Sequence, residues 1–260
     1  MRELGSCVAP ISGEHLISES VIEVLQGEGG FSISGVPWLA KGEEKILSKK
    51  SLRANCLCTK HNSSLAPIDE AAKQLFRALK IFLDSDVGEP RHVLVSGHDI
   101  ERWLLKTAKA LAVSGNLVHN EKRLSGAFAK DISLVDMLDD PTAWPEGAGL
   151  YCVMNEGDLM VNHSRFQLVP WVETAECRDE IVALQVSILG FIFVLLLEQV
   201  DLEKYPLLGR ARYRPGRIEI QHPKSVSWVT ISWEDNSFHA TLKVQHVKHL
   251  AADQANGKAR

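Results

Sequence analysis

The chain has 260 residues, of which 45% are hydrophobic and 24% are charged, and its formal net charge is −4. These values are typical of a soluble globular protein with one large domain or two smaller ones. They exclude a protein that is drawn to nucleic acid by its overall charge. Any such binding must therefore come from a local basic surface.

The five cysteines are an odd number, and the chain opens with the polar run Met1-Arg2-Glu3-Leu4 rather than with an apolar signal segment. We therefore expect a cytoplasmic protein with reduced thiols. Cys152 and Cys177 lie in β-patterned sequence, and we expect them to be inert core thiols.

Residues 1–68 are rich in glycine and proline and carry only short apolar runs. We expect a short helix from about Ser18 to Leu25 and a short strand over residues 31–35. A region with so little apolar surface is typical of small folds that a metal ion holds together.

From residue 69 the pattern becomes helical. Asp69 is predicted to cap a first helix, and Asp99 is predicted to cap a second helix that ends at Gly115. The apolar stripes of the two helices comprise Ala71, Leu75, Phe76, Leu79 and Phe82, and then Ile100, Trp103, Leu104, Ala108 and Leu111. We expect these helices to link the N-terminal region to the rest of the chain.

After about residue 130 the sequence favours strands. Residues 149–154 and 159–161 flank a turn-like Asn155-Glu-Gly-Asp158, which predicts a hairpin. Further strands are expected over residues 166–172, 217–221, 226–232 and 238–244. The apolar run 181–197 is borderline in length for crossing a bilayer. Because Gly190 interrupts it and β-branched residues are common in it, we favour two core strands over a membrane span.

The sequence Cys58-Thr-Lys-His61 has the spacing of a zinc knuckle, in which two ligands three residues apart reach one tetrahedral ion. Cys7 is a candidate third ligand. Cys56 shares a face with Cys58 in an extended strand but cannot form the same turn. The alternative is a buried thiol beside a hydrogen-bonded imidazole, with no metal.

Two stretches carry a family resemblance. Gly13-Glu14-His15-Leu-Ile-Ser and Asn55-Cys-Leu-Cys58-Thr-Lys-His61-Asn62 together resemble the HNH, or ββα-metal, endonucleases. In that family an acidic residue and a histidine begin the motif, and a zinc knuckle followed by Asn or His closes it. The resemblance covers about the first eighty residues and is strongest to uncharacterised bacterial proteins with a degenerate form of the motif.

This resemblance implies roles for five residues. His15 would be the general base that activates water, while Glu14 and Asn62 would bind a catalytic Mg²⁺ or Mn²⁺. Cys58 and His61 would hold a structural zinc ion, to which we add Cys7 as the candidate third ligand. The substrate would be a phosphodiester, with DNA as the expected partner.

The sequence departs from the family at three points. The second cysteine that the family pattern places before Cys7 has no counterpart in residues 1–6. Arg53 stands where the middle asparagine of the motif is expected, and Glu14 replaces the commoner Asp or His. We expect an HNH-type endonuclease, and the alternative is a non-catalytic zinc-stapled protein whose β-rich region binds a partner. A basic run around the motif is either a nucleic-acid surface or an ordinary solvated surface. It comprises Lys41, Lys45, Lys49, Lys50, Arg53 and Lys60.

The expected architecture is therefore α+β. We predict an HNH-like, treble-clef module over residues 1–68, a helical linker over 69–130, a β-rich region over 131–249 and a frayed tail over 250–260.

Overall fold

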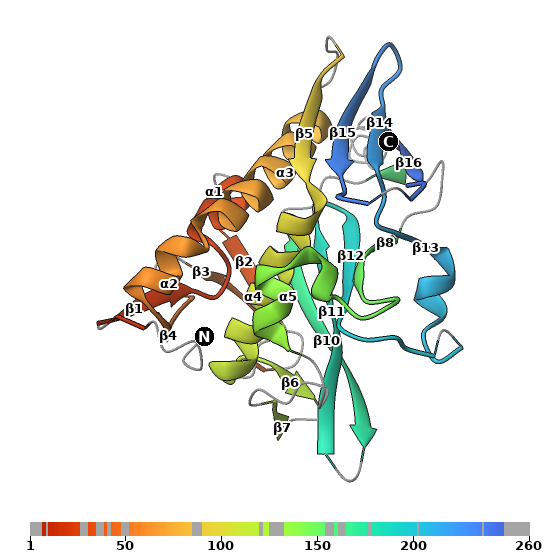
Figure 1. Ribbon diagram of the computed structural model, residues 1–260. Helices are drawn as coiled ribbons and strands as arrows, with labels where there is room; N and C mark the ends of the chain where they lie inside the picture. The colour runs from red at the N-terminus through yellow and green to blue at the C-terminus, as the bar shows by residue number, and fades with distance from the viewer. Residues whose placement is uncertain are drawn as a thin grey trace, which may run out of the picture.

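The computed structural model is a mixed α/β structure with several sheets (Figure 1). It describes residues 7–8, 10–26, 31–34, 39–40, 43–47, 52–84, 90–119, 122–124, 133–153, 159–160, 165–175, 178–201, 203–235 and 237–246. Cys177 and the predicted tail over 250–260 lie outside these residues. No helix in the described part is both long and apolar enough to cross a membrane.

The larger sheet has seven strands in the order β13-β8-β12-β11-β10-β2-β3. Their bounds are Ala211–Tyr213, Gly149–Val153, Phe191–Leu196, Arg178–Ile188, Arg165–Ala175, Phe31–Ser34 and Glu44–Leu47. The predicted pair of core strands in the run 181–197 is confirmed, since β11 and β12 form an antiparallel hairpin. Leu189 and Gly190 at its turn both have positive φ, as a tight reversal requires.

A second sheet has the order β5-β15-β14-β16-β9. Its strands span His92–Ser96, Val226–Ser232, Arg217–Gln221, Thr241–His246 and Leu159–Met160. The predicted hairpin between β8 and β9 is wrong, because the two strands belong to different sheets. The turn residues 155–158 lie outside the described part of the chain.

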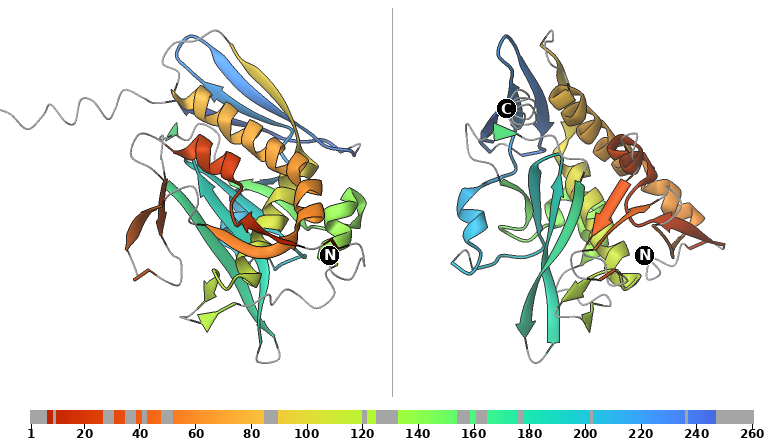
Figure 2. Two further views of the ribbon diagram at one scale, coloured as in Figure 1. Left: turned by 90° about the vertical axis from the view of Figure 1, so that its left-hand side faces the viewer. Right: turned by 180° about the vertical axis from the view of Figure 1, so that it is seen from behind.

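Two long helices pack between these sheets and the N-terminal region (Figures 1 and 2). The helix α3 spans Ala66–Asp84 and α4 spans Gly97–Val113. They are core elements rather than a linker, because Phe76 and Trp103 are fully buried and pack edge to face, with ring centroids 5.4 Å apart. The predicted caps need correction: α3 begins before Asp69, and the α4 cap is Ser96, whose hydroxyl accepts the Asp99 N–H.

The strands of the N-terminal region belong to two different sheets. Strands β1 (Ile11–His15) and β4 (Arg53–Cys58) pair antiparallel, and the helix α2 (Thr59–Ser64) follows β4 directly. The helix α1 (Glu19–Leu25), predicted from the sequence, packs on α3. Strands β2 and β3, in contrast, extend the seven-stranded sheet, where β2 runs parallel to β10. The strands of residues 1–68 therefore belong to two different sheets.

The remaining elements are short. The strands β6 and β7 span Val118–His119 and Lys122–Arg123, and the helix α5 spans Leu134–Asp139. The 3-10 helices η2 and η3 span Pro141–Ala143 and Pro206–Arg210.

Candidate metal centre

Three of the residues predicted from the sequence meet at the end of the β1–β4 ladder. Cys58 is the last residue of β4 and the N-cap of α2, and His61 lies one turn into that helix. The side chain of Cys7 reaches the same place from the segment before β1. The ligand atoms of Cys7, Cys58 and His61 all lie within 4.8 Å of one another, and among the described residues no other group of three or more His, Cys, Asp or Glu side chains does so.

The distances suit a tetrahedral ion. His61 Nδ1 lies 3.3 Å from Cys58 Sγ and 3.6 Å from Cys7 Sγ. Zinc bonds of about 2.3 Å to sulfur and 2.0–2.1 Å to nitrogen, at a tetrahedral angle, place S and N about 3.6 Å apart. The three side chains are thus already near the separation that a shared ion requires.

The start of α2 also favours the thiolate form of Cys58, which is the form that binds a metal ion. The backbone N–H of His61, with those of Val8 and Lys60, hydrogen-bonds to this sulfur and lowers the pKa of the thiol despite partial desolvation. Cys58 and His61 are buried, whereas Cys7 is exposed. The centre therefore has a protein-facing side and a side open to solvent.

Cys56 does not join this centre. It lies farther back along β4, beside α4, and burial followed by the nearby Glu14 carboxylate raises the pKa of its thiol, although Lys106 opposes this. Cys152 is buried in β8, and burial raises its pKa strongly, as expected for an inert core thiol. The structure thus separates the ligand cysteine Cys58 from its neighbour two residues away.

Glu14 lies inside the protein, in an ion pair that the sequence analysis did not foresee. Its Oε1 is 2.5 Å from Lys106 Nζ, and Lys106 also contacts both carboxylate oxygens of Asp69 at 2.8 Å. Asp69 in turn accepts a short hydrogen bond from the Ser18 hydroxyl, which itself accepts the Trp103 indole N–H at 2.7 Å. One signal was present in the sequence: Lys106 falls on the buried stripe of α4, three residues after Trp103.

His15 lies on the opposite face of β1 from Glu14, because successive side chains of a strand alternate. Arg53 Nε donates to His15 Nε2 at 2.9 Å, and Glu19 Oε2 lies 3.7 Å from the same nitrogen. The lone pair that a general base would need is therefore already engaged. Arg53, which stands in the place of the expected asparagine, is the residue that engages it.

Asn62 follows His61 in α2 and is half-buried. The helix begins where Cys58 pairs with Ile11, whereas His15 pairs with Arg53 at the far end of the ladder. At about 3.3 Å per residue, the two ends are roughly 13 Å apart. The structure therefore gathers the predicted zinc ligands and leaves Glu14, His15 and Asn62 in three different surroundings.

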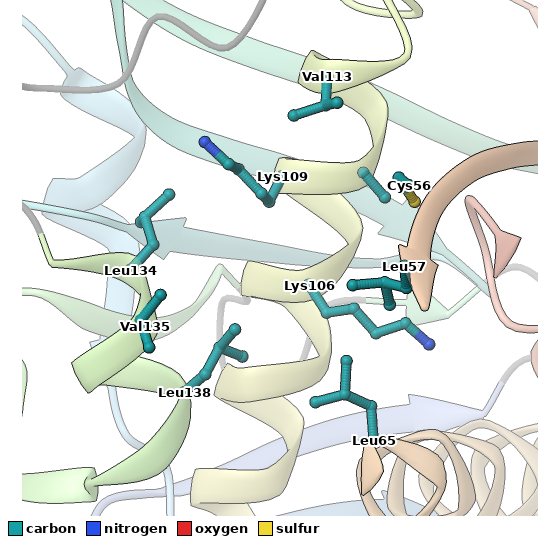
Figure 3. A pocket seen from close by; sticks show the side chains of 10 residues that line it. Cys56, Leu57, Leu65, Lys106, Lys109, Val113, Leu134, Val135 and Leu138 are labelled. Atoms are coloured by element: carbon teal, nitrogen blue, oxygen red, sulfur yellow. The ribbon is translucent and has the colours of Figure 1, made fainter. Parts of the chain in front are cut away.

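A small cavity of about 190 Å³ lies behind β4, between α4 and α5 (Figure 3). Most of its wall is aliphatic, and Cys56 closes one end. In Figure 3 Lys106 extends past Leu57 toward the N-terminal strands, whereas Lys109 points to the opposite side. The Lys106 ammonium is thus directed out of the cavity and into its ion pair with Glu14 and Asp69.

Only half of the basic run around the motif lies in the described part of the chain. Lys41, Lys49 and Lys50 lie outside it. Arg53 contacts Glu19 at 3.7 Å, and Lys45 and Lys60 are exposed on separate elements.

A second polar cluster lies at the other end of α4. Arg214, a non-glycine residue with φ of 41°, forms a two-point ion pair with the fully buried Glu101 at 2.9 and 3.1 Å. Asp235 Oδ1 is 2.7 Å from His239 Nε2, and His239 Nδ1 is 2.7 Å from the Arg214 carbonyl oxygen. A cavity of about 330 Å³ adjoins these groups.

Glycines make room for this cluster. A Cβ on Gly97 would meet the Trp233 ring at 2.5 Å. The Trp233 indole N–H donates to the Pro215 carbonyl oxygen, and Arg214 lies over the same ring, 5.2 Å from its centroid. The segment 214–216 is thus fixed from several sides.

Comparisons with known proteins give no relatives: no family model, curated protein or solved structure matches this chain.

Proposed function

We propose that Cys7, Cys58 and His61 hold a structural zinc ion, and that the protein acts by binding a partner rather than by cutting nucleic acid. The observation that carries the proposal is the spacing of the three ligand atoms, which is close to that of a zinc-bound set. Two sulfurs and one imidazole are soft and borderline ligands, which favour zinc over Mg²⁺ or Ca²⁺.

The ion would act as a staple. Cys7 belongs to the segment before β1, whereas Cys58 and His61 belong to the β4–α2 corner. The β1–β4 ladder is only two strands wide, and such a ribbon is marginal without further support. A metal that ties its two strands together at one end would stabilise the fold directly, because the unfolded chain offers no assembled site.

The surroundings of Glu14 and His15 support the non-catalytic form of the proposal. A carboxylate that neutralises a buried lysine can bind a catalytic metal only by giving up that ion pair, after which Lys106 would keep Asp69 but lose Glu14. An imidazole whose nitrogen accepts from Arg53 must first lose that bond before it can take a proton from water.

The second candidate is the HNH endonuclease with DNA as substrate. The order of strand, strand and helix in β1, β4 and α2 favours it, because that order is the one the family resemblance implies. In this case Glu14, His15 and Asn62 would have to converge around Mg²⁺ or Mn²⁺, which requires rearrangement of the Lys106 and Arg53 contacts.

Metal analysis of the purified protein tests the staple. We expect one zinc per chain in the wild type and in Cys56→Ser, and loss of zinc in Cys58→Ser and in His61→Ala. Cys56→Ser is the matched control because this cysteine lies in the same strand but faces α4. A wild-type chain without zinc, or a Cys58→Ser variant that retains it, would overturn the proposal.

Incubation with supercoiled plasmid and Mg²⁺ or Mn²⁺ separates the two candidates. The binding proposal predicts no nicking by the wild type. Nicking by the wild type that disappears in His15→Ala would establish the nuclease instead. Nicking that persists in His15→Ala would show that His15 is not the base and would point to a contaminating activity.

A further inference from the structure

Three glutamates gather on the face of the seven-stranded sheet that is turned away from α3 and α4. Glu173 in β10 and Glu180 in β11 are directly opposite each other in the antiparallel register. Glu198 follows β12, beside the point where the Leu197 N–H bonds to the Val182 carbonyl. In Figures 1 and 2 the long helices lie on one side of β10–β12 and the 3-10 helix η3 lies on the other.

The aromatic side chains near these glutamates belong to a small separate hydrophobic cluster. Trp171 and Tyr205 stack with ring centroids 4.6 Å apart and an interplanar angle of 5°. The Tyr205 hydroxyl donates to Glu173 Oε1 at 3.2 Å. Burial, and then the adjacent Glu173 carboxylate, raise the pKa of Tyr205 to about 12, so the phenol stays neutral and acts as a donor.

The glutamates carry more negative charge than their described neighbours balance. Glu180 is only 8% exposed, and its Oε1 has no hydrogen-bond partner within the described residues. Burial, followed by the charges of Glu173 and Glu180, raises the pKa of Glu198. Among the described residues, Lys204 Nζ lies 3.7 Å from Glu173 Oε1, on a side chain that is 59% exposed.

Such an arrangement is unfavourable unless something compensates for it. Like charges directly opposite each other in a sheet destabilise it. A buried carboxylate without a partner costs more still. Among the side chains that the structure describes, the three carboxylates therefore have no positive charge of matching size beside them.

We propose that Glu173, Glu180 and Glu198 form a binding site for a hard divalent cation, of the Ca²⁺ or Mn²⁺ type. Carboxylate oxygens are the ligands that these ions prefer, and the sheet fixes the three backbones from which the side chains reach. The site is independent of the Cys7–Cys58–His61 centre, whose sulfur ligands suit a softer ion.

The carboxylate oxygens do not yet form one tight group, since the three glutamates do not meet within 4.8 Å as the zinc ligands do. Binding therefore requires the glutamate side chains to turn toward a common point. Ca²⁺ tolerates this better than Mg²⁺, because it accepts variable coordination at 2.3–2.6 Å and does not demand a near-ideal octahedron.

Titration of the full-length protein with Ca²⁺ and with the luminescent probe Tb³⁺ tests the proposal. Trp171, next to Glu173 through its stack on Tyr205, provides the chromophore that sensitises Tb³⁺ emission. We expect saturable emission that Ca²⁺ displaces, and a melting temperature that rises by roughly 5 °C when Ca²⁺ is about 100-fold above its Kd. In Glu180→Gln both effects should weaken at least tenfold.

Two further variants keep the result interpretable. Glu70→Gln removes an exposed carboxylate that pairs with Lys73 on α3, so it controls for general loss of surface charge. Arg178→Gln removes the cationic residue two positions before Glu180. The proposal is overturned if the wild type shows neither Tb³⁺ emission nor a Ca²⁺-dependent rise in melting temperature. It is also overturned if Glu180→Gln responds like the wild type, or if only Arg178→Gln responds. Stabilisation by acid alone, without any Ca²⁺ effect, would show that a shared proton compensates the cluster instead.

Discussion

Replacement of Lys106 by methionine distinguishes a structural Glu14 from a catalytic one. Methionine has a similar length and no charge, so the substitution removes the ammonium and leaves two carboxylates facing each other. Lys106 and Glu14 are each about 5% exposed, and Asp69 is partly buried. The substitution therefore uncovers charge in a region that solvent screens poorly.

The magnitude follows from the burial of the pair. Removal of one partner from a buried ion pair typically costs about 3–5 kcal/mol, because the other charge stays uncompensated. For a chain of this size, that corresponds to a fall in Tm on the order of 10 °C. Glu14→Gln should also destabilise, by about 1–3 kcal/mol, because Lys106 keeps Asp69 as a partner.

Urea denaturation followed by circular dichroism measures both variants and their combination. In Lys106→Met/Glu14→Gln the repulsion between carboxylates is gone, so we expect the double variant to be more stable than Lys106→Met alone. The reasoning is refuted if Lys106→Met costs less than about 1 kcal/mol. It is equally refuted if Glu14→Gln stabilises the protein, as removal of a strained catalytic carboxylate often does.

Two further predictions concern the Arg214 cluster. Partial burial raises the pKa of Asp235, but hydrogen bonds from Ser237 and His239, with the charge of Arg214, outweigh this and hold the pKa below its ordinary value. The stability that the ionised Asp235 contributes is therefore complete above the unfolded pKa of about 3.9, and it is lost as the pH falls through the lower folded pKa. We therefore expect the stability difference between the wild type and Asp235→Asn to shrink below about pH 4 in acid-unfolding curves. The second prediction is that Gly97→Ala lowers the free energy of unfolding by about 1–3 kcal/mol, because the new methyl group meets a fixed indole ring. Gly209→Ala is the control: no atom lies within 4 Å of its added Cβ, so it should be close to neutral in urea denaturation. Equal effects of the two substitutions would contradict the packing argument.

The three candidate metal ligands could be predicted because their geometry is local. Cys58 and His61 are three residues apart, and that spacing places both side chains on one side of the first turn of α2. Cys7 follows from its position just before β1, the strand that pairs with β4. Only the pairing of β1 with β4, two segments that the motif itself identified, was needed to bring Cys7 to Cys58 and His61.

Glu14 could not be assigned in the same way. Its surroundings depend on Lys106 and Asp69, which come from two other helices, and no local pattern links the three. The order Glu-His suggested one site for both residues, yet strand alternation sends neighbouring side chains to opposite faces.

Sheet pairing shows the same limit. The β11–β12 hairpin was predictable because a tight turn joins its strands. The proposed β8–β9 hairpin was wrong because β8 pairs with β12 and β13, which are distant in sequence. A glycine-containing turn signal indicates a reversal of the chain but does not determine the partner strands.

The parallel pairing of β2 with β10 has a consequence for the order of events during synthesis. Ile33 pairs with Phe166, so the edge formed by β2 and β3 has no sheet to join until β10 has left the ribosome. At about 5–20 residues per second, that delay is on the order of ten seconds. The cysteines and histidine of the metal centre emerge long before then. If the proposed zinc ion binds, the nascent chain therefore has time to bind it before β2 and β3 can join the seven-stranded sheet.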